Sequence, residues 1–326
     1  MKVATCRHYG AATGVRIEML PDPAPGAGEV LIKVFASTVT SGDWRVRSQT
    51  VPWGFGLLMR AALGWNALRQ PILGTEFCGE VVALGAGVRG FAPGDCVVGF
   101  TGAAMGCHAE LVVMAAAGVL VHKPLALSIP EAAAISFGGT AALTFLRDGG
   151  RVQVGEQVLV IGAAGNVGIA AVQIAKAMGA EVTAQCGAAH RGAMKALGAA
   201  RVIDRDAGDF TQGGQVWDVI FDATGSVSYA QARPVLSCDG RLLLLAADLP
   251  QMMAALGNPF RRQKVRVGPA AERLEDLRVL AEMAEAGAYR PIIDSRFPLE
   301  QIAKAHQRVE QHGKCGSVVV MMDARG

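Results

Sequence analysis

The sequence predicts an α/β protein in which a doubly wound parallel sheet is preceded and followed by β-rich segments. Residues 1 to about 125 hold short strand-like runs separated by turn residues, and a β-like run returns at 317–322. From residue 128 onward, strand-like apolar runs alternate with helical patterns. That order implies a parallel sheet covered by helices on both faces.

The two parts of the chain differ in the elements that we expect. In the first part the strand-like runs are 30–35, 80–84, 96–99 and 109–113. In the second part the expected strands are 158–161, 181–186, 201–203, 217–222 and 241–247, followed by 264–267 and by a helix over 273–286. We expect the last run, 317–322, to return to the first part of the chain.

The most specific local signal is the turn that follows the apolar run 158–161. Glycines occur at 162, 165 and 168, and a helical pattern begins at once. Gly162 suits a tight turn, Gly165 would let a pyrophosphate approach the backbone, and Gly168 would let the helix lie close to the strand. The N–H groups at the helix start would face the anion. The pattern predicts a dinucleotide site, and a purely structural glycine turn is the alternative.

Composition limits the class of protein. With 326 residues, 51% of them hydrophobic and 18% charged, the chain can form two domains with cores. A net charge of +3 without lysine or arginine runs argues against a nucleic-acid partner. Apolar runs end well before the ~18 residues of a membrane span, and residues 1–5 lack the apolar core of a signal peptide. Seven dispersed cysteines without a C-x-x-C pair predict reduced thiols and a cytoplasmic location.

Several motifs together carry a family resemblance. They are Pro-Ile-Leu-Gly-Thr-Glu-Phe at 71–77, Pro-Gly-Asp at 93–95, Phe-Gly-Gly-Thr at 137–140, the glycine turn, Phe-Asp-Ala-Thr-Gly at 221–225 and Phe-Pro-Leu at 297–299. With these motifs nearly the whole chain resembles the medium-chain dehydrogenase/reductase superfamily, in particular its zinc-independent quinone oxidoreductase-like branch. The resemblance implies a GroES-like catalytic domain over 1–125, completed by 287–326, with a Rossmann NADP(H)-binding domain inserted over 126–286.

The zinc ligands of the wider family are not matched. Zinc-dependent relatives carry Cys and His where this chain has Thr40 and Thr75. Threonine hydroxyls are poor zinc ligands, and a catalytic site needs about three N, S or carboxylate donors. We therefore expect no metal site, and a regrouping of Cys78, Cys107 and His108 is the alternative.

The resemblance also indicates catalytic residues. Asp43 matches the aspartate of the family's Asn-Pro-x-Asp turn, near the nicotinamide and the substrate pocket. The alternative is a turn aspartate that bonds its own backbone. Thr40 replaces the usual Asn, and Arg45 stands where quinone reductases often have Tyr, so no specific proton donor is identified. Thr40 and Ser41 could donate a hydrogen bond to the reacting carbonyl, and the predicted catalytic set is Thr40, Ser41 and Asp43.

The second strand of the dinucleotide unit bears on cofactor choice. An NAD-specific site usually has Asp or Glu at its end, but here it ends in Cys186 and Gly187. NADP(H) is therefore expected, with Arg191 as the best phosphate ligand because a guanidinium binds phosphate oxygens in pairs. A solvated charge is the alternative for Arg191. The predicted cofactor-binding residues are Thr140, Gly162, Ala163, Gly165, Asn166, Val167, Gly168, Cys186, His190, Arg191, Ala223, Thr224 and Lys314.

Two further groups of residues, a segment rich in apolar side chains and the histidines, bear on the substrate site. The segment 51–69 is rich in large apolar residues and would be a lid over a bulky apolar substrate or plain core; its candidates are Trp53, Phe55, Met59 and Trp65. None of the histidines is expected to be an essential base. For His108 packing is favoured, and His306 and His312 are expected at a surface or between domains.

The leading functional prediction is an NADPH-dependent, zinc-independent oxidoreductase that transfers hydride to a quinone, an enone or a related activated carbonyl compound. The alternatives are a zinc-free NADP(H)-binding sensor or structural protein without turnover, and an alcohol dehydrogenase. The run 264–267 would be an edge strand, and the resemblance suggests that two such edges pair in a homodimer.

Overall fold

The computed structural model describes residues 1–51, 53–212, 214–311 and 313–322. The described residues fall into two compact units. Unit 1 contains Met1–Val51, Gly56–Phe137 and the described residues from Glu272 onward. Unit 2 contains Gly138–Ala271 and the short stretch 53–55. The two ends of the chain therefore share unit 1, and unit 2 is built almost wholly from one continuous segment.

Unit 2 alternates strands and helices. Its strands are β8 (Gln157–Ile161), β9 (Glu181–Cys186), β10 (Arg201–Asp204), β11 (Trp217–Asp222), β12 (Leu236–Leu244) and β13 (Lys264–Val267). Its helices are α5 (Asn166–Ala177), α6 (Arg191–Ala196), α7 (Tyr229–Ala232) and α8 (Leu249–Ala255). The helix α4 (Ser136–Leu143) and the π-helical turn Thr144–Gly150 precede them, and the division between the units falls inside α4.

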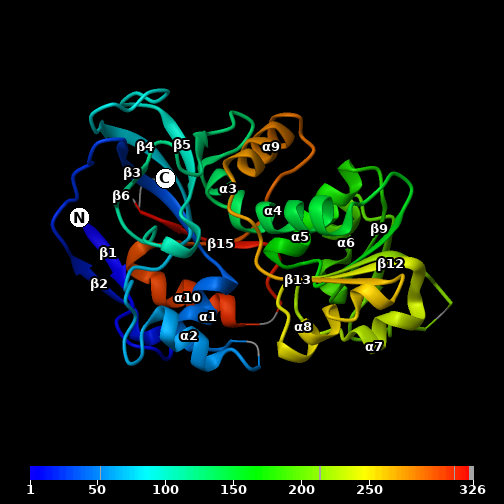
Figure 1. Cartoon of the computed structure of the whole chain (residues 1–326). Helices are drawn as coiled ribbons and strands as arrows, with labels where there is room; N and C mark the ends of the chain where they lie inside the picture. Colours follow the sequence, from blue (N-terminus) through cyan, green and yellow to red (C-terminus); the bar gives the residue numbers. More distant parts are fainter. Residues whose placement is uncertain (52, 213, 312, 323–326) are drawn as a thin grey trace. The chain divides into compact units, whose positions relative to one another are not determined.

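The sheet of unit 2 is parallel throughout its described pairings, with the order β10-β9-β8-β11-β12-β13. This order places the first strand in the middle and reverses direction beside it, as in doubly wound dinucleotide folds. Val158, Leu159 and Val160 are fully buried, because a central parallel strand is covered on both faces. The predicted doubly wound sheet is confirmed, and Figure 1 shows its strands fanned beside α5 and α6.

Unit 1 is rich in β-structure. Its strands are β1 (Lys2–Thr5), β2 (Arg16–Met19), β3 (Glu29–Val39), β4 (Glu76–Leu84), β5 (Cys96–Phe100), β6 (Leu111–Ala115), β7 (Leu120–His122), β14 (Ile293–Pro298) and β15 (Ser317–Met321). Its helices are α1 (Ser41–Ser48), α2 (Gly56–Leu63), α3 (Ile129–Ala133), α9 (Leu274–Glu285) and α10 (Ile302–Glu310). Within the described residues the larger sheet has the order β14-β15-β3-β4-β5-β7, with β6 also paired to β3.

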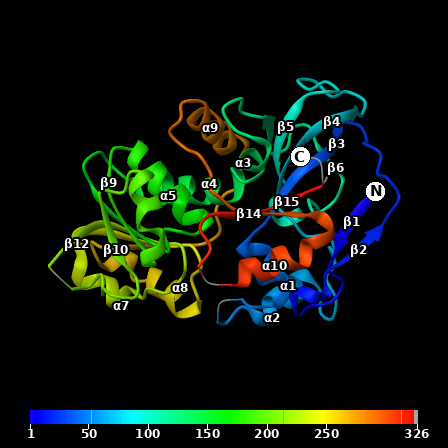
Figure 2. The same cartoon turned by 180° about the vertical axis from the view of Figure 1, so that it is seen from behind.

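The last strand completes the sheet of the first part of the chain, as we expected from the run 317–322. β15 lies antiparallel to β3, with Val319 opposite Thr38, and parallel to β14. Figure 1 shows the red end of the chain beside the blue strand β3, and the pair of β14 and β15 is seen from behind in Figure 2.

The helix α1, which carries the predicted catalytic residues, packs on the core of unit 1. Buried apolar residues of β3, β4 and β5, among them Ile32, Phe77 and Val97, form the centre of this core. The helix α10 buries Ile302 and Val309 and packs against both α1 and β15. α1 is thereby held against the sheet. Among the described residues no helix is long and apolar enough to cross a bilayer.

Candidate nucleotide and substrate sites

The glycine turn of unit 2 has the geometry expected for Gly162 and Gly168. Gly162 has a φ of +74°, and a Cβ there would lie 2.5 Å from Cγ2 of Thr224. A Cβ on Gly168 would lie 2.2 Å from the carbonyl oxygen of Gly162, so the first turn of α5 approaches the loop too closely for any side chain. Both glycines are thus required by the fold itself.

Gly165 differs from the other two glycines. Its φ is −73°, and the nearest atom to an added Cβ is the Gly162 carbonyl oxygen at 3.4 Å, an ordinary contact. Gly165 is the N-cap of α5, and no side chain caps the helix there. The N-terminus of this 12-residue helix therefore has no side-chain cap, and the Gly165 position itself is not crowded by other described residues. Uncapped helix N-termini of this kind bind phosphate groups.

A buried carboxylate shapes the neighbouring loop after β11. Asp222 is fully buried and accepts hydrogen bonds from Thr224 N (2.8 Å), Thr224 Oγ1 (2.6 Å) and Val227 N (2.8 Å). These bonds hold Thr224 against Gly162. Sequence reasoning assigned Asp222 no role, although an aspartate after an apolar strand and before Thr and Gly is the pattern of an Asx turn.

The end of β9 contains the predicted phosphate ligands. Cys186 is buried, His190 is half-buried and Arg191 is exposed at the start of α6. Among the described residues the Arg191 side chain has no hydrogen bond or ion pair, so its guanidinium is available, while its backbone N donates to the Ala188 carbonyl. The backbone N of Arg205, just past β10, donates to the Cys186 carbonyl (2.9 Å), which brings a second guanidinium to this edge. Sequence reasoning missed Arg205 because it considered only the segment that follows β9.

In unit 1 the predicted catalytic residues lie at the N-terminus of α1. Asp43 is fully buried, and its Oδ2 accepts hydrogen bonds from Thr40 N (2.7 Å) and Thr40 Oγ1 (2.6 Å). Its Oδ1 accepts from Gly74 N at 2.7 Å. Thr40 and Asp43 form a capping box, and the single hydroxyl proton of Thr40 is committed to it. Ser41 is exposed and, among the described residues, its hydroxyl has no partner.

Glu76 is a buried acid. In the sequence it stands out only as part of the motif at 71–77, and no role was predicted for it. Its carboxylate accepts from Thr38 Oγ1 (2.6 Å) and from Phe137 N (2.6 Å), near the start of α4. Burial raises the pKa of Glu76 to about 7, although these hydrogen bonds favour the charged form. Its neighbour Thr75 is also buried, and the Thr75 hydroxyl has no partner among the described residues.

The zinc-ligand positions of the family hold groups that do not fit zinc. Thr40 is committed to Asp43, and Thr75 offers only a hydroxyl. Cys107 contacts the Thr101 hydroxyl at 3.1 Å. In the part of the chain that the structure describes, no three His, Cys, Asp or Glu residues are grouped so that they could hold a metal ion. The alternative grouping of Cys78, Cys107 and His108 is therefore not assembled there.

The histidines of unit 1 correct one expectation. His306 was expected at a surface or between domains, but it is fully buried, because α10 packs against α1 and β15. Its ring centroid lies 5.8 Å from that of His108, which is also buried. Burial, together with His108 and Arg47, holds the pKa of His306 well below its usual range. His306 is thus a neutral core residue, and His312 lies outside the described residues.

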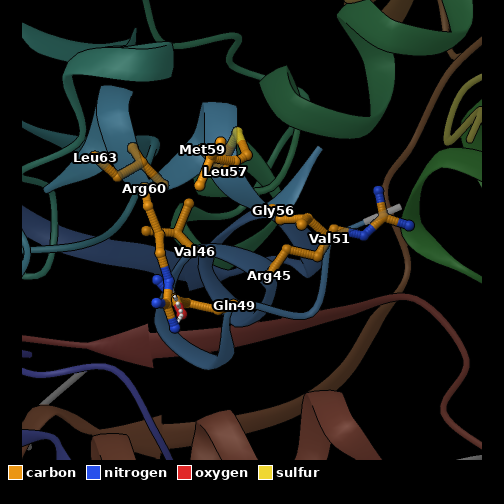
Figure 3. Close-up of a pocket in the computed structure, with 9 residues that line it drawn as sticks. All are labelled: Arg45, Val46, Gln49, Val51, Gly56, Leu57, Met59, Arg60 and Leu63. Atoms are coloured by element: carbon orange, nitrogen blue, oxygen red, sulfur yellow. Dashed lines mark hydrogen bonds between the residues drawn. The ribbon is translucent and has the colours of Figure 1, made fainter. Parts of the chain in front are cut away.

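The expected lid residues are largely exposed. Trp53 is 71% exposed and Trp65 57% exposed, and α2 has no buried residue among those described. A pocket of about 330 Å³ lies between α1 and α2 and includes Met59 in its lining (Figure 3). Met59 and Trp65 belong to unit 1, whereas Trp53 and Phe55 belong to unit 2.

The remaining predicted cofactor residues are divided between the units. Thr140 is buried in unit 2 as the fifth residue of α4, beyond the first turn of that helix. Ala163, Asn166 and Val167 lie in the glycine turn and the first turn of α5, and Ala223 follows β11. Lys314 is a half-buried residue of unit 1, where Nζ donates to the Gly316 carbonyl (3.3 Å) and burial lowers its pKa.

Comparisons with known proteins agree with this architecture. Residues 26–125 match the family described as "Alcohol dehydrogenase GroES-like domain", and residues 197–320 match the family described as "Zinc-binding dehydrogenase". The predicted GroES-like part is therefore confirmed.

Three known proteins show the extent of the likeness. The chain is 30% identical to the mitochondrial NAD(P)H oxidoreductase RTN4IP1 of Danio rerio, over 90% of this chain and 84% of that protein. It is 27% identical to the chloroplastic quinone-oxidoreductase QR1 of Triphysaria versicolor, over 95% of both. The solved structure of the quinone oxidoreductase from Coxiella burnetii superposes with a TM-score of 0.87 at 25% identity, over 99% of both chains.

Proposed function

We propose that this chain, which belongs to the medium-chain dehydrogenase/reductase superfamily and to its quinone oxidoreductase-like branch, is an NADPH-dependent, zinc-independent reductase. Its substrate would be a quinone, an enone or a related activated carbonyl compound. As a member of this family it is an NAD(P)H-dependent oxidoreductase that acts on a small molecule. The choice of NADPH, the absence of zinc and the substrate class are the proposal.

The observation that carries the proposal is the open N-terminus of α5 beside Gly165. In a doubly wound sheet the ligand site lies at the carboxyl ends of the strands where the strand order reverses, here beside β8. Gly165 leaves that space open, while Gly162 and Gly168 close the loop behind it. The cofactor would supply the hydride, and the chain would bind and orient it.

The choice of NADPH rests on the residues at the end of β9. Cys186 and Gly187 present no carboxylate that would repel a 2′-phosphate. Arg191, exposed and without a partner among the described residues, would bind that phosphate, assisted by His190 and by Arg205 from the next strand. The ion pair of Arg205 with Asp206 (3.0 Å) is exposed, so it can open at small cost.

On the substrate side we assign the hydrogen-bond donor to Ser41. Hydride addition places negative charge on the carbonyl oxygen, and an oriented hydroxyl stabilises it. Thr40 and Asp43 act as positioning residues, because their capping box fixes the start of α1 from which Ser41 projects. Thr40 and Thr75 stand where zinc ligands would be, so this hydroxyl would replace a metal as the polarising group.

The two alternatives make different predictions in one experiment. NADPH is mixed in a stopped-flow instrument with the protein and a panel of quinones and enones, and its oxidation is followed. A reductase oxidises NADPH with at least one panel member, and Ser41→Ala slows that reaction by about 100-fold without weakening NADPH binding. A protein that binds NADPH but oxidises none of it would be a sensor. Oxidation of simple alcohols by NADP⁺ would favour an alcohol dehydrogenase.

Location and assembly are part of the proposal. We place the protein in the cytoplasm, because none of the seven cysteines forms a disulfide in the structure, as is usual in a reducing compartment. β13 is an edge strand of its sheet. The backbone N–H and C=O groups along its outer edge pair with no other described strand. We propose that β13 of two copies pair in a homodimer.

A further inference from the structure

The pocket between α1 and α2 has an apolar wall and three polar side chains. Its volume is about 330 Å³, at the small end of the range of about 300–1,000 Å³ for small-molecule sites. Both helices belong to unit 1. The apolar lining consists of Val46, Val51, Leu57, Met59 and Leu63, and the polar lining of Arg45, Gln49 and Arg60.

The side chains of Arg60 and Gln49 are joined by hydrogen bonds. Arg60 Nε and Nη2 both donate to Gln49 Oε1, at 3.1 and 2.9 Å. These bonds join the middle of α2 to the C-terminus of α1, where Gln49 adopts the left-handed conformation with φ of 55°. These two bonds use two of the five N–H donors of Arg60 and a neutral acceptor, so Arg60 has no carboxylate partner among the described residues. Figure 3 shows the two side chains together at one side of the pocket.

Arg45 is a cation without a counter-charge. Among the described residues its side chain forms no hydrogen bond and no ion pair, and burial lowers the pKa of its guanidinium. Figure 3 shows this group on the other side of the lining residues from the Arg60 guanidinium, extending past Val51 and Gly56. A partly desolvated charge without a partner is costly, and a carboxylate would relieve that cost through paired, charge-assisted hydrogen bonds.

Arg45 is also placed next to the proposed hydrogen-bond donor. Ser41 and Arg45 are four residues apart on α1, and residues at this spacing lie on the same face of a helix. Ser41 does not itself line the pocket, so a ligand bound at Arg45 would reach Ser41 only with a part that extends one helical turn toward the N-terminus of α1. Two guanidiniums without a carboxylate partner among the described residues, an apolar wall and a small volume together fit a compact carboxylate ligand.

We infer that this pocket binds a carboxylate attached to an apolar chain, and that the substrate of the reductase carries such a carboxylate. The second part rests on the proposed function, and the first does not. The carboxylate pairs with Arg45, and the apolar chain lies against Leu57, Met59 and Leu63.

Direct binding tests the pocket without turnover. Octanoate and octanamide have the same chain and nearly the same shape, and they differ in charge. By calorimetry at neutral pH, octanoate should bind at least about tenfold more tightly than octanamide. Arg45→Met should remove this difference, Arg45→Lys should keep part of it, and Arg89→Met, an exposed arginine outside the pocket, should leave it unchanged. Equal affinity of both ligands for the unmodified protein, or no effect of Arg45→Met in a variant with unchanged melting temperature, would refute the site.

Turnover separates this inference from the proposed function. A naphthoquinone with a propionate side chain is compared with its propionamide. The acid should have a KM at least about tenfold lower, and Arg45→Met should raise that KM without changing the kcat for the amide. If the amide is reduced but the acid has no advantage, the inference about the substrate fails and the proposed function stands. If octanoate binds through Arg45 and neither quinone is reduced, the proposed function fails and the pocket stands.

Discussion

Replacing Gly165 with valine should abolish tight NADPH binding without unfolding the protein. Replacing Gly168 with alanine should instead destabilise the fold. At Gly165 the backbone is extended and an added Cβ meets only the Gly162 carbonyl oxygen at 3.4 Å. The fold therefore accepts a side chain there, and the side chain occupies the space in front of α5. If the pyrophosphate loses two hydrogen bonds of roughly 1.5–3 kcal/mol each, the affinity falls at least about 100-fold.

The matched substitution at Gly168 affects the fold. Its Cβ would lie 2.2 Å from the Gly162 carbonyl oxygen and 2.6 Å from Cα of Ala163, which are backbone atoms that cannot turn aside. Overpacking of this kind costs about 3 kcal/mol or more, which lowers the melting temperature by roughly 6–12 °C in a domain of this size class.

The assay measures both quantities on both variants. NADPH affinity is followed by calorimetry or nucleotide fluorescence, and stability by thermal unfolding without ligand. We expect Gly165→Val to keep its melting temperature within about 2 °C and to lose NADPH binding. Unchanged NADPH affinity in a folded Gly165→Val protein would refute the assignment of this loop to the pyrophosphate.

Four further predictions follow from the structure. Because Thr40 and Thr75 occupy the ligand positions, elemental analysis should find much less than one zinc per chain, and stoichiometric zinc with activity lost to chelators would contradict this. Light scattering at micromolar concentration should show a dimer that pairs through Lys264–Val267; a monomer alone would count against it. Arg191→Glu should raise the dissociation constant of NADPH by ten-fold or more and that of NADH little, whereas equal losses would remove Arg191 from the phosphate site. Since the folded chain holds the Glu76 proton up to about pH 7 and the unfolded chain releases it near pH 4.5, this group makes stability fall as pH rises through that window, by roughly 1.4 kcal/mol per unit. Glu76→Gln should flatten that slope in chemical denaturation, and an unaltered slope would show that Glu76 does not titrate there.

The features that could be predicted from the sequence are those encoded by neighbouring residues. The strand β8, the turn at Gly162 and the start of α5 follow one another within a dozen residues, so their pattern contains the geometry. The capping box was equally local, because Thr40 and Asp43 stand three apart before a helix. The sequence indicated Asp43 but not that three donors already occupy its carboxylate.

The features that were missed depend on elements far apart in the chain. His306 was expected at a surface or between domains, because the sequence does not say which side of its helix another helix will cover. Arg205 reaches the end of β9 only because β10 pairs with it. The pocket at Arg45 exists because α2 returns to the C-terminus of α1, which no periodicity in either helix encodes.

The position of β15 has a consequence for how the protein is synthesised. This strand, the last in the chain, lies between β14 and β3 rather than at an edge of its sheet. Until β15 has been translated, residues 36–39 of β3 lack their partner strand, whereas the continuous segment of unit 2 can fold as soon as it emerges. The sheet that contains β3 is thus completed only after unit 2 has been made, and a nascent chain stalled before Ser317 would expose an open β-edge that is prone to aggregation.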